Sequence, residues 1–392
     1  MAPEETTTKE DTPTGTANSH QQVTDMMSSG RHSDDAWMST RCSEFSDEDL
    51  PGTAKPMTLF LAVEHLSGWG HDIMDDDVLG ELAAPLARVL KDNCASMQFI
   101  RKPGRAGQYR DERKLYIART DHGTCYTTRI SGIEDLLSLD IPALADGTWG
   151  TCTLPPRDVV RVDHPIMLVC THGKRDRCCA IKGRPLAAGM QSCFFGDEVW
   201  ETSHAKGHRF APTMILLPWG YSYGRLSTAQ AVDAVTVSAQ GKMYLTGLRG
   251  RGCWDAPGQA AEIAVAQALG AHTVPVGSLV VTETTADEHD AVAHQGVPEP
   301  ASPSTLSRAT DRSGLFPTDE RWAVSTEEKE LASAELTTSE LTTTWRTVTT
   351  PRGDKWAVQL AHVPAGKVMA SCGTPPKDGK TWMAWRTIQV YP

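Results

Sequence analysis

Two stretches of the chain show the same succession of hydrophobic patterns. In the first, the apolar run 57–64 is typical of a buried strand, and residues 78–93 have the apolar spacing of a helix. Further elements of this stretch are expected as strands at 96–102, 114–120 and 124–130 and as a short helix near 133–139.

The second stretch begins with the apolar run 166–170, which again predicts a buried strand. A polar loop, a helix near 184–190 and strands at 198–203, 213–218 and 221–226 are expected to follow. Ser227 is suited to begin a helix that extends to about Val237, because serine caps helix N-termini well. A further helix at 260–269 follows Pro257, a residue typical of helix starts.

Strand–helix–strand followed by strand–strand–helix is the order of elements in a thioredoxin-like core. Because both stretches have it, we predict an α/β (α+β) fold with two tandem thioredoxin-like modules, at 54–160 and 161–285. Residues 345–392 contain three or four short strand patterns separated by Pro and Gly turns, which predicts a small C-terminal β-domain.

Two polar stretches flank these units. Residues 1–53 are rich in Thr, Ser, Asp and Glu and poor in large apolar residues, so we expect a disordered N-terminal tail. Residues 286–344 contain VPEPASPSTLS and a Thr/Glu-rich tract, and are expected to form a linker.

Charge and composition limit the cellular compartments and the classes of binding partner that are expected. The net charge of −11 makes a general affinity for nucleic acid or anionic membranes unfavourable. No apolar run is long enough to cross a bilayer, and the N-terminus lacks the basic start and apolar stretch of a secretory signal. We therefore expect a cytoplasmic protein, in which clustered cysteines indicate metal or redox chemistry.

Most of the ten cysteines are widely spaced and are expected to be inert, buried thiols. These are Cys42, Cys94, Cys125, Cys152, Cys193, Cys253 and Cys372.

The remaining cysteines lie close to one another. Cys170 ends a predicted strand, and Cys178 and Cys179 follow after the polar loop. Another predicted strand leads to His204, with His208 four residues later. Because two strand ends of one sheet can direct their loops to the same place, these thiols and imidazoles can converge, and both ligand types suit iron and zinc.

Other motifs are absent. The sequence contains no C-x-x-C, which excludes a thioredoxin-type dithiol and the usual halves of a zinc ribbon. HAKGH lacks the Glu of H-E-x-x-H, which disfavours a zinc metalloprotease.

Several longer motifs identify a family resemblance. CTHGKRDRCCAIKGRPLA, VWETSHAKGHRFAPTMILLP, YGRL and TGLRGRGC, preceded by GTAKPMTLFLAVEHLSGWGHD, have an order and spacing that resembles the sucrase/ferredoxin-like family of thioredoxin-like ferredoxins, over roughly residues 42–270. The pattern of that family, C-x8-C followed by H-x3-H, holds a [2Fe–2S] cluster. Carried over, the resemblance implies Cys170, Cys179, His204 and His208 as cluster ligands, with Cys178 as a second choice in place of Cys179.

The resemblance implies an electron carrier. A glycoside hydrolase is not expected, because the sequence shows no identifiable pair of carboxylates suited to that reaction. Two neutral imidazoles in place of thiolates raise the potential of a [2Fe–2S] cluster. A free ring nitrogen can also titrate, so proton-coupled reduction is expected, with a potential that falls as pH rises. The expected partner is a redox protein, either a reductase or an acceptor.

Basic residues surround the proposed ligands in this acidic protein. They can stabilise electrons on the cluster or dock an acidic redox partner. This basic set consists of Lys174, Arg175, Arg177, Lys182 and Arg184.

Two alternatives stay open. The first is a structural zinc protein with the same four ligands and no redox activity. The second is a thiol enzyme using Cys178 and Cys179, which is disfavoured because adjacent cysteines form strained disulfides.

Overall fold

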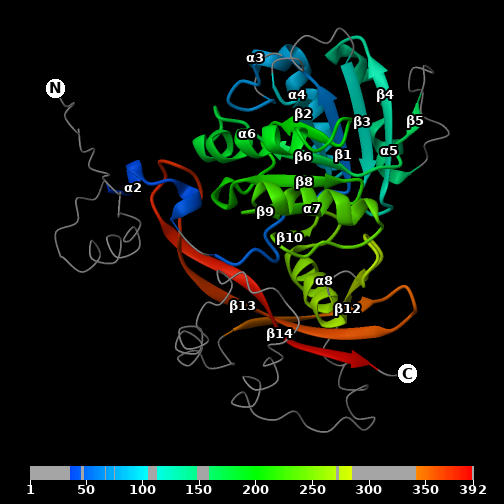
Figure 1. Ribbon diagram of the computed structural model, residues 1–392, viewed down its shortest axis with the longest axis vertical. Coiled ribbons are helices and arrows are strands. Elements are labelled where there is room, and N and C mark those ends of the chain that lie inside the picture. The colour runs from blue at the N-terminus through cyan, green and yellow to red at the C-terminus, as the bar shows by residue number, and fades with distance from the viewer. Residues whose placement is uncertain are drawn as a thin grey trace, which may run out of the picture.

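The computed structural model describes residues 36–45, 48–66, 68–74, 76–104, 113–147, 159–270, 273–284 and 341–390. It is a mixed α/β structure with one large mixed sheet and one small antiparallel sheet (Figure 1). The helices discussed below are α2 (Ala36–Ser39), η1 (Cys42–Glu44), α3 (Asp76–Leu79), η2 (Gly80–Leu82), α4 (Ala83–Asp92), η4 (Ile133–Ser138), α5 (Ile141–Asp146), α6 (Arg177–Gln191), η6 (His208–Phe210), α7 (Thr228–Ala239) and α8 (Ala256–Leu269).

The large sheet has ten strands in the order β10-β9-β8-β6-β7-β2-β1-β3-β4-β5. Their bounds are β1 (Leu59–Glu64), β2 (Ala95–Arg101), β3 (Arg113–Arg119), β4 (Thr124–Ile130), β5 (Val160–Arg161), β6 (Ile166–Cys170), β7 (Val199–Thr202), β8 (Thr213–Leu217), β9 (Tyr221–Gly224) and β10 (Leu248–Arg251).

The two halves of this sheet repeat one pairing pattern. In the first half β1 pairs parallel with β2 and antiparallel with β3, which pairs antiparallel with β4. In the second half β6 pairs parallel with β7 and antiparallel with β8, which pairs antiparallel with β9. The antiparallel pair β2–β7 joins the halves into one continuous sheet.

Alternate positions along the strands pack into different cores. Met167 and Val169 of β6 pack with residues of α6 and α7, which lie side by side in Figure 1. Leu168 belongs instead to a cluster with Phe60 and Ala62 of the first half. Because strand side chains alternate between faces, both faces of the sheet are buried, and the halves share the second cluster.

The small sheet has four antiparallel strands, β11 (Val280–Thr284), β12 (Thr342–Thr349), β13 (Lys355–Val368) and β14 (Lys377–Val390). Helix α8 packs against it, below the large sheet in Figure 1. Val348, Val358 and Leu360 lie in the same buried cluster as residues of α8 and of the large sheet. The C-terminal strands therefore extend an existing core instead of forming a separate one.

Several predicted elements are confirmed, including the strands at 124–130 and 166–170 and the helix capped by Ser227. The helix expected at 78–93 is divided into α3, η2 and α4. The helix expected at 184–190 begins seven residues earlier, at Arg177, because the Asp176 carboxylate accepts a hydrogen bond from the N–H of Cys178 and caps it.

The flanking regions also differ in part from expectation. Within the stretch 1–53, residues 36–45 and 48–53 have a described conformation that includes α2 and η1. Most of the expected linker 286–344 lies outside the described residues, and β12 begins at its end. The fourth strand of the small sheet is β11, which the sequence placed at the end of the preceding unit.

Candidate metal centre

The proposed ligands lie at one edge of the large sheet. Strands β6 and β7 are parallel, and Cys170, the last residue of β6, is in register with Thr202, the last residue of β7. The loops that follow the two strands therefore start at the same edge, as the sequence predicts. Cys179 lies in the first turn of α6, and His204 lies in the loop after β7.

Interactions link Cys170 with Cys179 and His204, and the ring of His208 stacks on that of His204. The Cys170 sulfur accepts side-chain hydrogen bonds from Cys179 and His204, and backbone N–H bonds from Ala205 and His172. The Cys179 bond is the largest of these effects. Together they hold the pKa of Cys170 well below its usual range although burial opposes the shift. The pKa of Cys179 is raised, mainly because it donates to Cys170.

The imidazoles complete the arrangement. The His204 and His208 rings are stacked, with centroids 5.1 Å apart. The Cys170 and Cys179 side chains are fully buried, whereas that of His208 is 12 % exposed. The two thiols therefore lie in the protein interior, and the His208 imidazole lies nearer the surface.

The ring nitrogens of His204 and His208 show whether these residues are suited to bind a metal. The Nδ1 atoms of His204 and His208 are buried and have no hydrogen-bond partner among the described residues. An unpartnered polar atom is costly to bury, and an imidazole nitrogen in this state is a ready metal ligand. Two thiols and two such nitrogens therefore fit a centre that takes sulfur and nitrogen ligands.

Arg249 stabilises the loop that carries His204 and His208. This guanidinium is almost fully buried and donates to the carbonyls of Lys206 and Thr53. Burial lowers the pKa of Arg249 to about 9, so it stays protonated at neutral pH. Gly207 has a φ of +77°, and a Cβ there would lie 2.4 Å from the guanidinium, so the loop requires glycine at this position.

His172 and the basic residues near the site have structural contacts. His172 Nε2 donates to the Gly70 carbonyl. Arg177 donates to the carbonyls of Ser39 and Thr40, and Lys182 forms an ion pair with Glu44. Arg177 and Lys182 therefore contact the N-terminal segment, whereas Lys174 and Arg184 are exposed.

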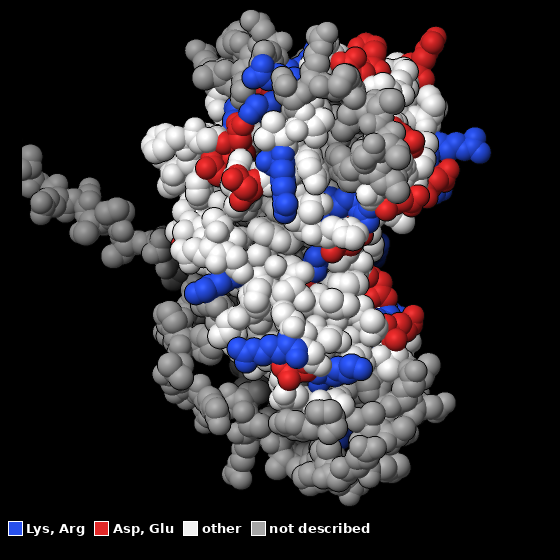
Figure 2. All heavy atoms as spheres, turned by 90° about the vertical axis from the view of Figure 1, so that its right-hand side faces the viewer, with Lys and Arg blue, Asp and Glu red and all other residues white. Residues whose placement is uncertain are grey.

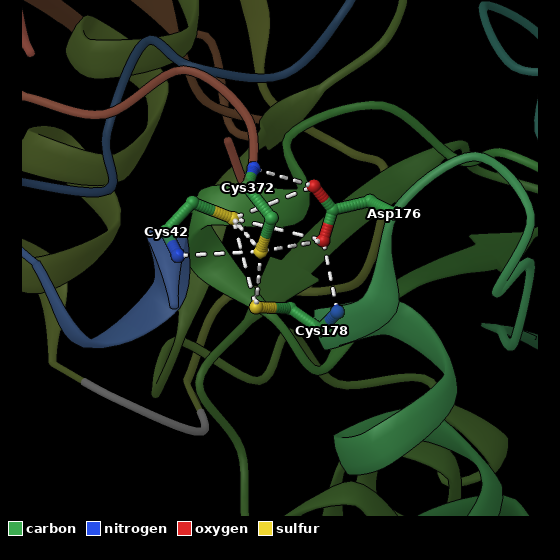
Figure 3. A group of neighbouring side chains, drawn as sticks. All are labelled: Cys42, Asp176, Cys178 and Cys372. Carbon is green, nitrogen blue, oxygen red and sulfur yellow. Dashed lines mark hydrogen bonds between the residues drawn. The ribbon is translucent and has the colours of Figure 1, made fainter. Parts of the chain in front are cut away.

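A second group of metal-ligand side chains lies beside the first, and the sequence analysis missed it. It consists of Cys42 from η1, Asp176 and Cys178 at the start of α6, and Cys372 from the turn between β13 and β14 (Figure 3). The ligand atoms of these four residues all lie within 4.8 Å of one another. Spacing could not reveal the group, because Cys42 and Cys372 are 330 positions apart and were expected to be inert thiols.

Hydrogen bonds within this second group are dense. Sulfur–sulfur distances are 3.6 Å for Cys42–Cys178, 3.2 Å for Cys178–Cys372 and 3.5 Å for Cys372–Cys42. The Asp176 carboxylate accepts from the N–H groups of Cys178 and Cys372 and from the Ser371 hydroxyl.

The protonation states in this group follow from these contacts. Burial opposes ionisation of Asp176, but the Cys372 N–H, His208 and the Cys178 N–H outweigh it, so the pKa of Asp176 is lowered. The hydrogen bond from Cys42 lowers the pKa of Cys178 to about 5 although burial opposes it, and the pKa of the donating Cys42 is raised.

The fold is that of a mixed α/β protein, and thiols and imidazoles of the kind that can hold a metal lie at and beyond the ends of two parallel strands. The family model described as sucrase/ferredoxin-like matches residues 50–250, and the chain belongs to this family. No match was found among the curated proteins or among the solved structures. In the described part of the chain, no helix combines the length and apolar character needed to cross a membrane.

Proposed function

We propose that the protein carries single electrons on one [2Fe–2S] cluster held by Cys170, Cys179, His204 and His208. The observation that carries the proposal is the convergence of two buried thiols with two imidazoles whose buried Nδ1 atoms are unpartnered. When bound, the cluster would accept and release one electron. The family of the chain supports the same assignment.

The alternative is a structural zinc ion held by the same four residues. One tetrahedral zinc needs four ligands about 3.3–3.8 Å from one another, whereas two irons take two ligands each. The sucrase/ferredoxin-like family of the chain supports the iron–sulfur assignment, and a metal and sulfide assay separates the two.

The chain's own residues have defined tasks in this proposal. Backbone N–H groups of Ala205 and His172 donate to the Cys170 sulfur, and such bonds favour the reduced state because they offset added negative charge. With Nδ1 facing iron, Nε2 of His208 would hold the proton that accompanies the electron. This atom lies 3.9 Å from Asp176 Oδ2. The potential should then fall as pH rises.

The surroundings suggest an acidic redox partner in the cytoplasm. Lys174 is exposed in the loop between Cys170 and α6. A cavity of about 340 Å³ beside His204 is also lined by Lys55, Lys91 and Lys206. Positive charge near the proposed cluster would attract an acidic reductase or acceptor. The repeated pairing of the two sheet halves supports two thioredoxin-like modules, of which only the second carries the ligands.

Anaerobic purification followed by iron and sulfide assays and a visible spectrum tests the proposal. We expect two irons and two sulfides per chain. Cys170→Ser and His204→Ala should lose most of the visible absorption, whereas Cys193→Ser, at an exposed cysteine, should not. A colourless protein that holds zinc through the Cys170 set would contradict electron transfer.

A ligand exchange tests the role of the imidazoles more sharply. His208→Cys adds a thiolate to the cluster, so the potential should fall and its pH dependence should weaken. Redox titration between pH 6 and 9 measures both. An unchanged potential in His208→Cys, or a wild-type potential that is flat with pH, would contradict imidazole ligation by His208. Cys178→Ser should leave the cluster spectrum unchanged, which also tests the thiol-enzyme alternative.

A further inference from the structure

The second group joins three parts of the chain that are remote in sequence. Cys42 lies 136 positions from Cys178, and Cys178 lies 194 positions from Cys372. In Figure 3 the three sulfurs and the Asp176 carboxylate point toward one common centre. We propose that Cys42, Asp176, Cys178 and Cys372 bind one structural zinc ion, separate from the [2Fe–2S] cluster.

The geometry matches a tetrahedral ion. Zinc–sulfur bonds of about 2.3 Å place tetrahedral sulfurs about 3.8 Å apart, and an oxygen ligand about 3.5 Å from each sulfur. The three sulfur–sulfur distances, 3.2, 3.5 and 3.6 Å, are close to this spacing. Asp176 Oδ1 lies 3.4 Å from the Cys372 sulfur and 3.7 Å from that of Cys42. Small side-chain shifts would admit the ion.

The surroundings are organised as in a closed structural site. Cys42, Cys178 and Asp176 are buried, so solvent has little access to the centre. The Cys42 N–H donates to the Cys372 sulfur, and the Cys372 N–H and Ser371 hydroxyl orient the carboxylate. Such outer hydrogen bonds fix ligand orientation in metal sites.

Charge also favours a cation at this place. The Asp176 carboxylate is buried among three cysteine sulfurs, and carboxylates and thiolates are ligands that bind divalent cations. Thiols can serve as small apolar residues, and Met369 and Ala211 pack beside these sulfurs. The Asp176 carboxylate is held facing these sulfurs, because it caps α6 and accepts from the N–H groups of Cys178 and Cys372. On binding, zinc would displace the remaining thiol protons into solvent.

The ion would have a clear structural task. Helices α2 and η1 have four and three residues, too few to be stable alone. In Figure 1 this N-terminal segment lies beside the turn between β13 and β14, at the left side of the molecule near α6. A zinc ion would fasten both segments to the start of α6, where the next residue after Cys178 is the proposed cluster ligand Cys179.

Metal analysis of the full-length protein tests the proposal. Wild type purified with its cluster should contain one zinc per chain, and zinc X-ray absorption should indicate three sulfur ligands and one oxygen ligand. Cys372→Ser is the main variant, because Cys372 is only partly buried and tolerates replacement best. It should lose most of the zinc but keep its iron and sulfide. Asp176→Asn, which can still cap α6, should weaken zinc retention at least tenfold in competition with a chelator. Cys193→Ser is the matched control and should keep both metals.

The outcomes separate this site from the cluster. Zinc that stays bound in Cys372→Ser, or wild type without zinc, would overturn the proposal. A wild type in which Cys178 and Cys372 react with thiol reagents only after reduction would identify a disulfide instead. Loss of iron and sulfide in Cys372→Ser without any zinc in wild type would assign the group to the iron centre. Failure of the [2Fe–2S] proposal alone would appear as a protein with this zinc but no sulfide.

Discussion

Cys178 and Cys179 are adjacent in the sequence but make different contacts. Cys179 packs with Cys170, whereas Cys178 packs with Cys42. Successive side chains of an α-helix are about 100° apart around the axis, so Cys178 and Cys179 point in different directions from α6 and contact different residues. The sequence alone left the choice between these two cysteines open. The geometry favours Cys179 as the partner of Cys170.

His65 directly follows β1, is buried, and stacks on Phe99 with ring centroids 4.5 Å apart. Burial, assisted by the charge of Arg113, lowers the pKa of His65 to about 4. An unfolded histidine has a pKa of about 6.5, so the unfolded state binds the proton first as pH falls. His65 therefore favours folding above pH 6.5, and this contribution decreases as pH falls toward 4.

We expect His65→Gln to remove this pH dependence. Between pH 7 and pH 5, wild type should lose about 2 kcal/mol of unfolding free energy more than the variant does. Anaerobic urea unfolding at both pH values measures the difference. His122→Gln, at a histidine whose side chain is 65 % exposed, is the control and should behave as wild type. Equal pH dependence in wild type and His65→Gln would show that His65 is not buried in its neutral form.

At the scale of elements, the sequence predicted the two strands that lead to Cys170 and His204, from the apolar run 166–170 and the strand pattern 198–203. Their parallel pairing is a finding of the structure. It did not predict that α6 begins at Arg177, since the polar residues 172–177 look like a loop. Asp176 was the available signal, because aspartate is a good N-cap. The contacts of Cys42 and Cys372 depend on packing between remote segments, which no local pattern encodes.

Helix α6 packs tightly against the end of β6 at Gly183. A Cβ at this position would lie 2.0 Å from the Cys170 carbonyl oxygen, a backbone atom that cannot move aside easily. Gly183→Ala should therefore push α6 away from β6 and destabilise the protein by about 1–3 kcal/mol, despite the higher helix propensity of alanine. Because Cys179 lies on the same helix, iron content should fall as well.

The matched control for this packing is Arg184→Ala, at the next position of α6, where the side chain is exposed. It should leave the urea midpoint and iron content close to those of wild type. A Gly183→Ala protein as stable as wild type would mean that α6 and β6 are less closely packed than the structure indicates.

At the scale of the whole molecule, one sheet joins two halves with the same strand pairing, and only the second half carries the proposed ligands. The pattern of strands and helices made this repeat predictable. The joining pair β2–β7 and the shared core around Phe60 and Leu168 were not, since they depend on how the halves dock. The described part of the face in Figure 2 carries interspersed acidic and basic side chains, without a continuous basic patch.

The net charge of the protein and the charges near the proposed cluster predict opposite effects of salt on the rate at which an anionic reductant reduces the cluster. The net charge of −11 repels an anionic reductant, whereas Lys174 and Lys55 near the site attract it. The Debye length is about 10 Å at 0.1 M ionic strength, so nearby charges dominate in ordinary buffers. The rate of cluster reduction by dithionite should therefore fall as salt is added.

Stopped-flow reduction at 0.05–0.5 M salt tests this, with Lys174→Glu as the variant and Arg352→Glu as the control. Arg352 precedes β13, and a strand of 14 residues extends roughly 40 Å, so Arg352 lies far from the turn that carries Cys372. Lys174→Glu should slow reduction several-fold at low salt and weaken the salt dependence, whereas Arg352→Glu should change neither. A rate that rises with salt in wild type would mean that the overall negative charge controls access, and that the basic surface does not guide electron donors to the site.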